Sequence, residues 1–211
     1  MAPVFDEDFR KQLRQLFEWR RDVRRFRCEP LPPGLVNDLI GIACLSPSVG
    51  LSQPWRFVLV DDPERRARVR ANFSASNAAA LAGYAGERAA RYARLKLDGL
   101  DCAPHQLAVF ADRAATAGHG LGRVTMPETI EFSVVAAVTA LMLAARAHGV
   151  GVGWVSIIDP AALAADIDVP KHWRLIAYLC IGYPAVEDTV PMLQRAEWEI
   201  RREPKTFILC R

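Results

Sequence analysis

Residues 132–157 read FSVVAAVTALMLAARAHGVGVGWVSI and are the most strongly patterned part of the chain. The first half is apolar on nearly every helical face, so we expect a helix over residues 126–148 that is buried all round in the middle of the fold. Gly149 predicts the end of that helix, and the valine-rich residues 150–157 predict a strand. A buried helix followed by a strand indicates a globular domain with a sizeable core.

Segments on both sides of this core predict further strands and helices. Apolar or β-branched runs predict strands at residues 55–60, 106–111 and 174–181. Asp62-Pro63 and Asp159-Pro160 each place a capping oxygen before a proline, so we expect a helix to begin at each pair. Helices are also expected at residues 5–19 and 35–45, and a loop at residues 114–125. This order of elements predicts an α+β fold built on a mixed sheet.

Three further segments differ from the core in composition. The first helix carries an apolar stripe by which we expect it to dock: Phe9, Leu13, Leu16 and Phe17. Residues 67–100 are alanine-rich and dotted with charges, so we expect poorly anchored helices that form a mobile cover. Residues 205–211 form a β-prone run at the terminus, and a neighbouring subunit is one candidate to pair with it.

Composition limits the classes of protein to consider. The chain has 211 residues, of which 51% are hydrophobic and 24% charged, and its net charge is +3. At about 150 residues per domain, this length favours a single domain over residues 1–211. A net charge this small argues against proteins that coat nucleic acids or membrane surfaces, so we expect neither as a partner.

Cysteines, histidines and the N-terminus indicate a reducing compartment and no metal site. The five cysteines form no C-x-x-C pair and the four histidines are not closely spaced, so we expect free thiols and no bound metal. The N-terminus has acidic residues where a signal peptide needs basic ones, and no run of ~18 uninterrupted apolar residues occurs. We therefore expect a cytoplasmic protein.

Two motifs are candidates for ligand binding. RRDVR, residues 20–24, gathers guanidinium groups that suit a phosphate, although a solvated basic helix end has the same pattern. SPSVGLSQPWRF, residues 46–57, places the small residues Ser48 and Gly50 where a planar ligand can approach the backbone, and Gln53 offers both a donor and an acceptor. A plain turn before a strand is the alternative for this second motif.

Other glycine and serine patterns exclude several chemistries. The glycines of residues 149–156 lie between a helix and a strand, which is the reverse of the order that a dinucleotide site needs. No helix is predicted directly after Gly118, Gly120 and Gly122, and neither G-x-x-x-x-G-K-[ST] nor G-x-S-x-G occurs. We therefore expect neither nucleoside triphosphate chemistry nor a serine hydrolase.

Taken together, the motifs resemble those of the nitroreductase-like flavoproteins. The resemblance runs from Trp19 to Pro184 and rests on RRDVR, SPSVGLSQPWRFVLV, LGRVTMPET, AARAHGVGVGWVSI and IGYP. A typical family member has serine or threonine in place of Asp22 and asparagine in place of Leu51. Asp22 and Leu51 instead resemble the residues of one branch of the family, whose members consume reduced FMN. LKLDG at residues 95–99 and Ser156 resemble the same branch.

The resemblance implies a nitroreductase-like fold with a mostly antiparallel sheet, a helical lid at about residues 74–100, and a tail, residues 203–211, that packs on a partner subunit. It also implies a homodimer with two FMN sites at the subunit interface, each built from both chains. The implied FMN-binding residues are Arg20, Arg21 and Arg24 at the phosphate and ribityl end, Ser48 and Gln53 along the cofactor, Gly153 and Trp154 beside the ring, Arg88 and Leu97 in the lid, and Arg202 at the phosphate.

The reaction implied by this branch uses reduced FMN as a substrate. Molecular oxygen would fragment it to 5,6-dimethylbenzimidazole, the lower ligand of cobalamin, and erythrose 4-phosphate. Carbon C1′ of the ribityl chain becomes a ring carbon, so a bond to its neighbour breaks and a proton moves nearby. We expect Asp22 to accept that proton and Ser156 to orient or donate to the ring. No nicotinamide fingerprint occurs, so a separate flavin reductase would supply reduced FMN.

Two other functions stay open at this point. An NAD(P)H-dependent FMN reductase that acts on nitro or quinone compounds would share the fold and the FMN-binding residues. A non-catalytic flavin-binding protein could use the same arginines, and it would bind reduced FMN in air without consuming it.

Overall fold

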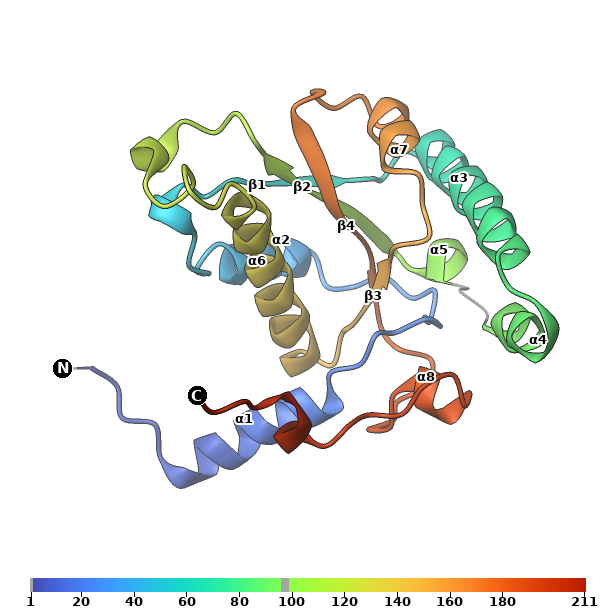
Figure 1. Ribbon diagram of the computed structural model, residues 1–211, viewed down its shortest axis with the longest axis horizontal. Helices are drawn as coiled ribbons and strands as arrows, with labels where there is room; N and C mark the ends of the chain where they lie inside the picture. Colours follow the sequence, from blue (N-terminus) through green and yellow to red (C-terminus); the bar gives the residue numbers. More distant parts are fainter. Residues whose placement is uncertain (1, 96–98) are drawn as a thin grey trace.

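A four-stranded sheet forms the centre of the computed structural model, which describes residues 2–95 and 99–211 (Figure 1). The strands lie in the order β1-β2-β4-β3, with β1 at Trp55–Leu59, β2 at His105–Asp112, β3 at Gly151–Val155 and β4 at Trp173–Gly182. All three neighbouring pairs are antiparallel. The strands were therefore predicted close to their observed positions, but the sheet formed by the described residues is antiparallel rather than mixed.

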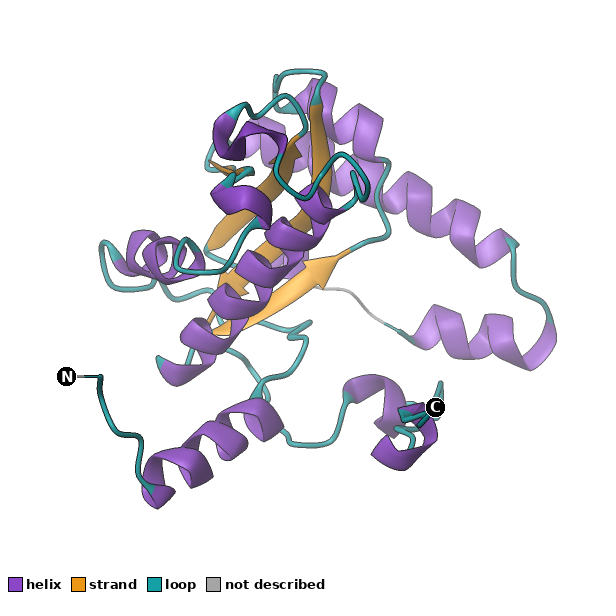
Figure 2. Ribbon diagram, turned by 60° about the vertical axis from the view of Figure 1, so that its left-hand side comes forward, coloured by secondary structure: helices purple, strands orange, loops and turns teal. Residues whose placement is uncertain are grey.

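Helices cover both faces of this sheet (Figures 1 and 2). One face packs on α2 (Leu35–Ala43) and α6 (Thr129–Ala147), and the other on α3 (Pro63–Ala82), α5 (Gly99–Cys102) and α7 (Pro160–Asp166). Successive side chains of a strand point to opposite faces, so Leu107 and Val109 of β2 contact the first layer while Ala108 and Phe110 contact the second. Because both faces are buried, the middle of β2, residues 107–111, is a continuous apolar run instead of an alternating one.

The capping predictions for two helices are confirmed. The Asp62 carboxylate accepts a hydrogen bond from the Arg65 N–H at 2.7 Å, and α3 begins at Pro63. Asp159 caps α7 in the same way, accepting from the Ala161 N–H at 2.8 Å. The remaining helices are α1 (Glu7–Trp19), α4 (Gly86–Arg94) and α8 (Met192–Arg195), with 3₁₀ turns η1 (Val49–Leu51), η2 (Ala117–Gly120) and η3 (Pro204–Phe207).

Helix α6 is buried on one side and exposed on the other. By length and composition it is apolar enough to cross a membrane, but much of it packs against α2 and the sheet as a core helix does. Phe132 and Val135, on its outer side, are 56% and 40% exposed. The prediction that this helix is buried all round is therefore wrong for a single chain.

Both ends of the chain also leave apolar side chains exposed. No residue of α1 is buried, and Phe9, Leu13 and Phe17 of its stripe are among the exposed hydrophobic residues, so the expected docking by this stripe is not made within one chain. The tail contains η3 in place of the β-prone run, and Phe207 and Ile208 are exposed. A strand needs a pairing partner, and the described residues of this chain supply none for the tail.

Candidate functional site

The arginine-rich segment leaves the end of α1 and runs along β3. The Val23 N–H donates to the Val152 carbonyl at 3.0 Å, and Asp22 forms an isolated parallel bridge with Val152. Position 153 has to be glycine, because a Cβ there would lie 2.1 Å from the Val23 carbonyl oxygen. A Cβ at Gly151 would lie 2.6 Å from the Val23 side chain. Two glycines of residues 149–156 thus let the arginine segment approach the sheet.

The Asp22 carboxylate is held by two donors. Its Oδ1 accepts a hydrogen bond from the Trp154 N–H at 2.8 Å, and its Oδ2 accepts one from Nε of Arg24 at 3.3 Å. The side chain of Asp22 is 41% exposed. The carboxylate therefore has a fixed direction and is still accessible to a ligand.

A cavity of about 180 Å³ opens beside Asp22, and we call it the Ser156 cavity. Most of its lining is apolar, and it comes from residues 22–24, β3, α3, α4 and the C-terminal region. The predicted site residues that it brings together are Asp22, Arg24, Gly153, Trp154 and Ser156. Ser156 follows the last residue of β3, and its hydroxyl makes no hydrogen bond to the described residues, so it is available to a ligand.

A second cavity, of about 330 Å³, adjoins the first, and we call it the arginine cavity. Asp22, Val23 and Arg24 line both cavities. The arginine cavity is lined by five arginines, which are Arg21, Arg24, Arg25, Arg94 and Arg195. Asp22 therefore lies where a largely apolar cavity meets a strongly cationic one.

Arg21 shows that this cationic region is suited to an anion. Burial lowers the pKa of Arg21, and the positive charges of Arg201 and Arg20 lower it further. The Nε of Arg21 is buried and has no hydrogen-bond partner among the described residues. Because a buried N–H without a partner is costly, a bound anion would stabilise this group. Arg20 lines a small neighbouring cavity together with Arg21.

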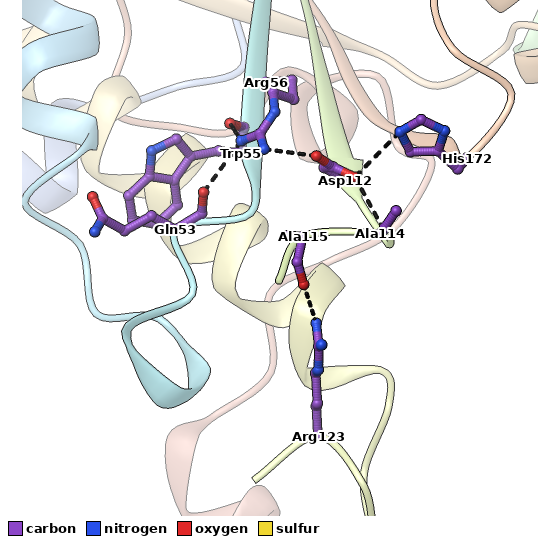
Figure 3. Close-up of polar contacts among 8 residues, drawn as sticks. All are labelled: Gln53, Trp55, Arg56, Asp112, Ala114, Ala115, Arg123 and His172. Carbon is purple, nitrogen blue, oxygen red and sulfur yellow. Dashed lines mark hydrogen bonds and ion pairs between the residues drawn. The ribbon is translucent and has the colours of Figure 1, made fainter. Parts of the chain in front are cut away.

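Ser48 and Gln53 lie in the loop before β1 and line neither cavity. Their loop is well anchored, because the Gln53 N–H donates to Oγ of Ser48 at 3.0 Å. Figure 3 shows that the Arg56 guanidinium donates to the Gln53 carbonyl and to the Asp112 carboxylate, at 3.3 and 2.6 Å. The single chain thus holds these two predicted residues firmly but apart from Asp22.

Three other predicted residues have different positions. The guanidinium carbon of Arg88, on α4, lies 5.8 Å from the ring centre of Trp198, which lines the Ser156 cavity. Leu97 lies outside the described residues. Arg202 is exposed and lines neither cavity, whereas its neighbour Arg201 is close enough to lower the pKa of Arg21.

Sequence reasoning missed several residues that line the Ser156 cavity, among them Asn77, Tyr92, Cys180 and Trp198. Tyr92 is buried, donates to Oδ1 of Asn77 at 2.9 Å and packs near the Trp198 ring. An aromatic residue within an alanine-rich segment was the available signal for Tyr92. Cys180 pairs with Gly153 in the sheet, and nothing in its apolar strand sequence distinguishes it from a core residue.

Comparisons with known proteins show which sequences this chain is similar to. Residues 17–183 match the Nitroreductase family. A Rhodospirillum rubrum protein named 5,6-dimethylbenzimidazole synthase is 55% identical over 95% of this chain and 95% of its own length. A Rhodobacter capsulatus protein of the same name is 47% identical over 92% of this chain and 94% of its own length.

A solved structure shows the same fold. The crystal structure of oxidized iodotyrosine deiodinase bound to FMN and 3-iodo-L-tyrosine superposes with a TM-score of 0.73, covering 94% of this chain and 97% of that one at 24% identity. Fold, motifs and sequence identity lead to one conclusion: the chain belongs to the Nitroreductase family.

Proposed function

We propose that the chain is a 5,6-dimethylbenzimidazole synthase, which uses reduced FMN and molecular oxygen to form 5,6-dimethylbenzimidazole and erythrose 4-phosphate. The 55% identity to the Rhodospirillum rubrum protein of that name, over nearly the whole of both chains, supports this function. The structural observation that carries it is the position of Asp22 at the junction of the two cavities.

The two cavities suit the two ends of FMN. The Ser156 cavity offers apolar and aromatic side chains, which suit a planar ring. The arginine cavity suits the phosphate, because guanidinium groups form strong charge-assisted hydrogen bonds with phosphate oxygens and Nε of Arg21 needs such a partner. With the ring and the phosphate so placed, the ribityl chain passes the shared lining at Asp22.

The reduced flavin supplies electrons to oxygen and the carbon atoms of the product. Asp22 accepts a proton from the ribityl chain near C1′, where the bond to the neighbouring carbon breaks. The hydrogen bonds from Trp154 and Arg24 keep this carboxylate in one orientation. Ser156 donates a hydrogen bond to the ring, and α3 and α4 shield the cavity from water.

The proposed active form is a cytoplasmic homodimer that receives reduced FMN from a separate flavin reductase. Exposed apolar residues on α6 and α1, such as Phe132 and Phe17, support an interface there. In this assembly, each FMN site is completed by Ser48 and Gln53 of the partner subunit. The tail at residues 203–211 packs on the partner.

The test uses purified protein, chemically reduced FMN and air, with mass spectrometry of the products. We expect 5,6-dimethylbenzimidazole to form without any nicotinamide. Steady oxidation of NADH with a nitroaromatic acceptor, without this product, would favour the FMN reductase instead. Reduced FMN that stays bound and intact in air would favour a non-catalytic flavin-binding protein.

A further inference from the structure

The described residues that line the arginine cavity carry more positive than negative charge. The cavity is lined by five arginines and two aspartates. Both aspartates are already paired, Asp22 with Arg24 at 3.3 Å and Asp188 with Arg195 at 3.2 Å. Arg21 and Arg94 form no ion pair with any described residue. These two guanidinium groups therefore give the cavity an excess of positive charge, which favours an anionic ligand.

Arg94 differs from the other arginines of its helix. Arg91, in the same last turn of α4, is bound to the Glu87 carboxylate at 2.7 Å and to the Glu197 carbonyl at 2.8 Å. Arg88 stacks over Trp198. One alternative role for Arg94 is to interact with the helix dipole, since a cation at a helix C-terminus does so favourably. That role does not explain why Arg94 lines a cavity together with arginines from distant segments of the chain.

The end of α4 also borders both cavities. Arg94 is the last residue of α4 and lines the arginine cavity, while Leu95, the next residue, lines the Ser156 cavity. A ligand that fills both cavities would therefore contact this end of the helix twice, once through a charge and once through an apolar side chain.

We infer that Arg94 is a phosphate-binding residue, supplied by the lid helix, that makes the site select FMN over riboflavin. Its guanidinium fork suits the oxygens of a phosphate monoester, and riboflavin differs from FMN only in lacking that group. This inference rests on the proposed function because it takes a flavin as the ligand. It does not depend on whether the flavin ring is fragmented.

Binding of oxidised FMN and of riboflavin, measured by quenching of flavin fluorescence, tests this role. Arg94→Met should weaken FMN binding about tenfold or more and change riboflavin binding less than about twofold, because only FMN loses a charge-assisted hydrogen bond. Arg94→Lys should fall between, since lysine keeps the charge but not the fork. Arg65→Met, on α3, removes one arginine that lines neither cavity and should leave both affinities unchanged.

An unfolding midpoint equal to that of the wild type shows that Arg94→Met is folded. The inference is overturned if this folded variant binds FMN normally, if it loses both flavins equally, or if the wild-type protein does not prefer FMN. These results are separable from the proposed function. A protein that makes no dimethylbenzimidazole but loses FMN selectively on Arg94→Met would contradict only the synthase activity.

Discussion

At the scale of single residues, Asp22 shows how backbone contacts direct one carboxylate. An ionised carboxylate can accept about four hydrogen bonds, and the described residues use two of these positions through Trp154 and Arg24. Gly153 permits this arrangement, because any larger residue would push residues 22–23 away from β3. The resemblance singled out Asp22, but only the tertiary structure shows that β3 sets its direction.

Cys180 lies directly behind this site and is predicted to be unreactive. Burial, and then the negative charge of Asp22, raise the pKa of its thiol from 9.0 to about 12. Because the thiolate is the reactive form, iodoacetamide at pH 8 should modify the exposed Cys44 much faster than Cys180 in the native protein, as measured by peptide mass spectrometry. Equal rates at the two cysteines would contradict this burial.

The same pKa shift predicts how stability depends on pH. The folded state holds the Cys180 proton more tightly than the unfolded chain does, so the contribution of this thiol is complete below pH 9.0 and is lost as the pH rises towards about 12. Between pH 8 and pH 10.5 the wild type should therefore lose more of its free energy of unfolding in urea than Cys180→Val does. Equal losses by the two proteins between these pH values would rule out this linkage.

At the scale of elements, an ion pair fastens the loop before β1 to the end of β2. Asp112 is 8% exposed, and its Oδ2 lies 2.6 Å from a guanidinium nitrogen of Arg56 (Figure 3). Arg56 also donates to the carbonyls of Gln53 and Trp55. Gln53 has a φ of +44°, which is strained for a residue other than glycine, so the loop depends on such anchors.

Removal of one partner of this pair should cost more than removal of an exposed pair. Asp112→Ala leaves the Arg56 charge without its partner, and we expect the free energy of unfolding in urea to fall by about 2–4 kcal/mol. The control is Glu18→Ala, which breaks the exposed Arg14–Glu18 pair on α1 and should cost less than about 1 kcal/mol. If both variants lost the same small amount, the loop would not depend on the pair.

Helices and strands were predicted correctly where the sequence signal comes from neighbouring residues. Strand composition and the Asp-Pro caps involve neighbouring residues, and β1, β2, α3 and α7 are found where they were predicted. The strand order, the Arg56–Asp112 pair and the Tyr92–Asn77 hydrogen bond join distant residues, and their formation depends on how the layers pack. The candidate site divides in the same way, because RRDVR and the glycines of residues 149–156 were visible separately but their meeting at Asp22 was not.

At the scale of the whole molecule, we expect a second copy of the chain to cover the exposed apolar residues of α1, α6 and the tail. We expect light scattering to give twice the chain mass of 23.4 kDa. Phe132→Asp places a charge in the proposed interface, and we expect it to yield monomers that bind FMN at least about tenfold more weakly, because Ser48 and Gln53 of the partner subunit are lost.

Ala162→Asp is the matched control for this substitution. It adds the same charge at an exposed position on α7, which covers the opposite face of the sheet, and should preserve both the dimer and FMN binding. A Phe132→Asp protein that stays dimeric would remove α6 from the interface. A monomer that binds FMN as tightly as the wild type would show that each site is complete within one chain.

The most direct measurement of the chemistry is the yield of 5,6-dimethylbenzimidazole from Asp22→Asn protein loaded with reduced FMN and exposed to oxygen. Asparagine keeps an oxygen that can accept from the Trp154 N–H but cannot take up a proton, so FMN should still bind within about threefold of the wild-type affinity. Product formation should fall by about 10²–10⁴, the usual contribution of a general base. Formation of dimethylbenzimidazole at the wild-type rate by flavin-loaded Asp22→Asn would contradict the proposed role of this carboxylate.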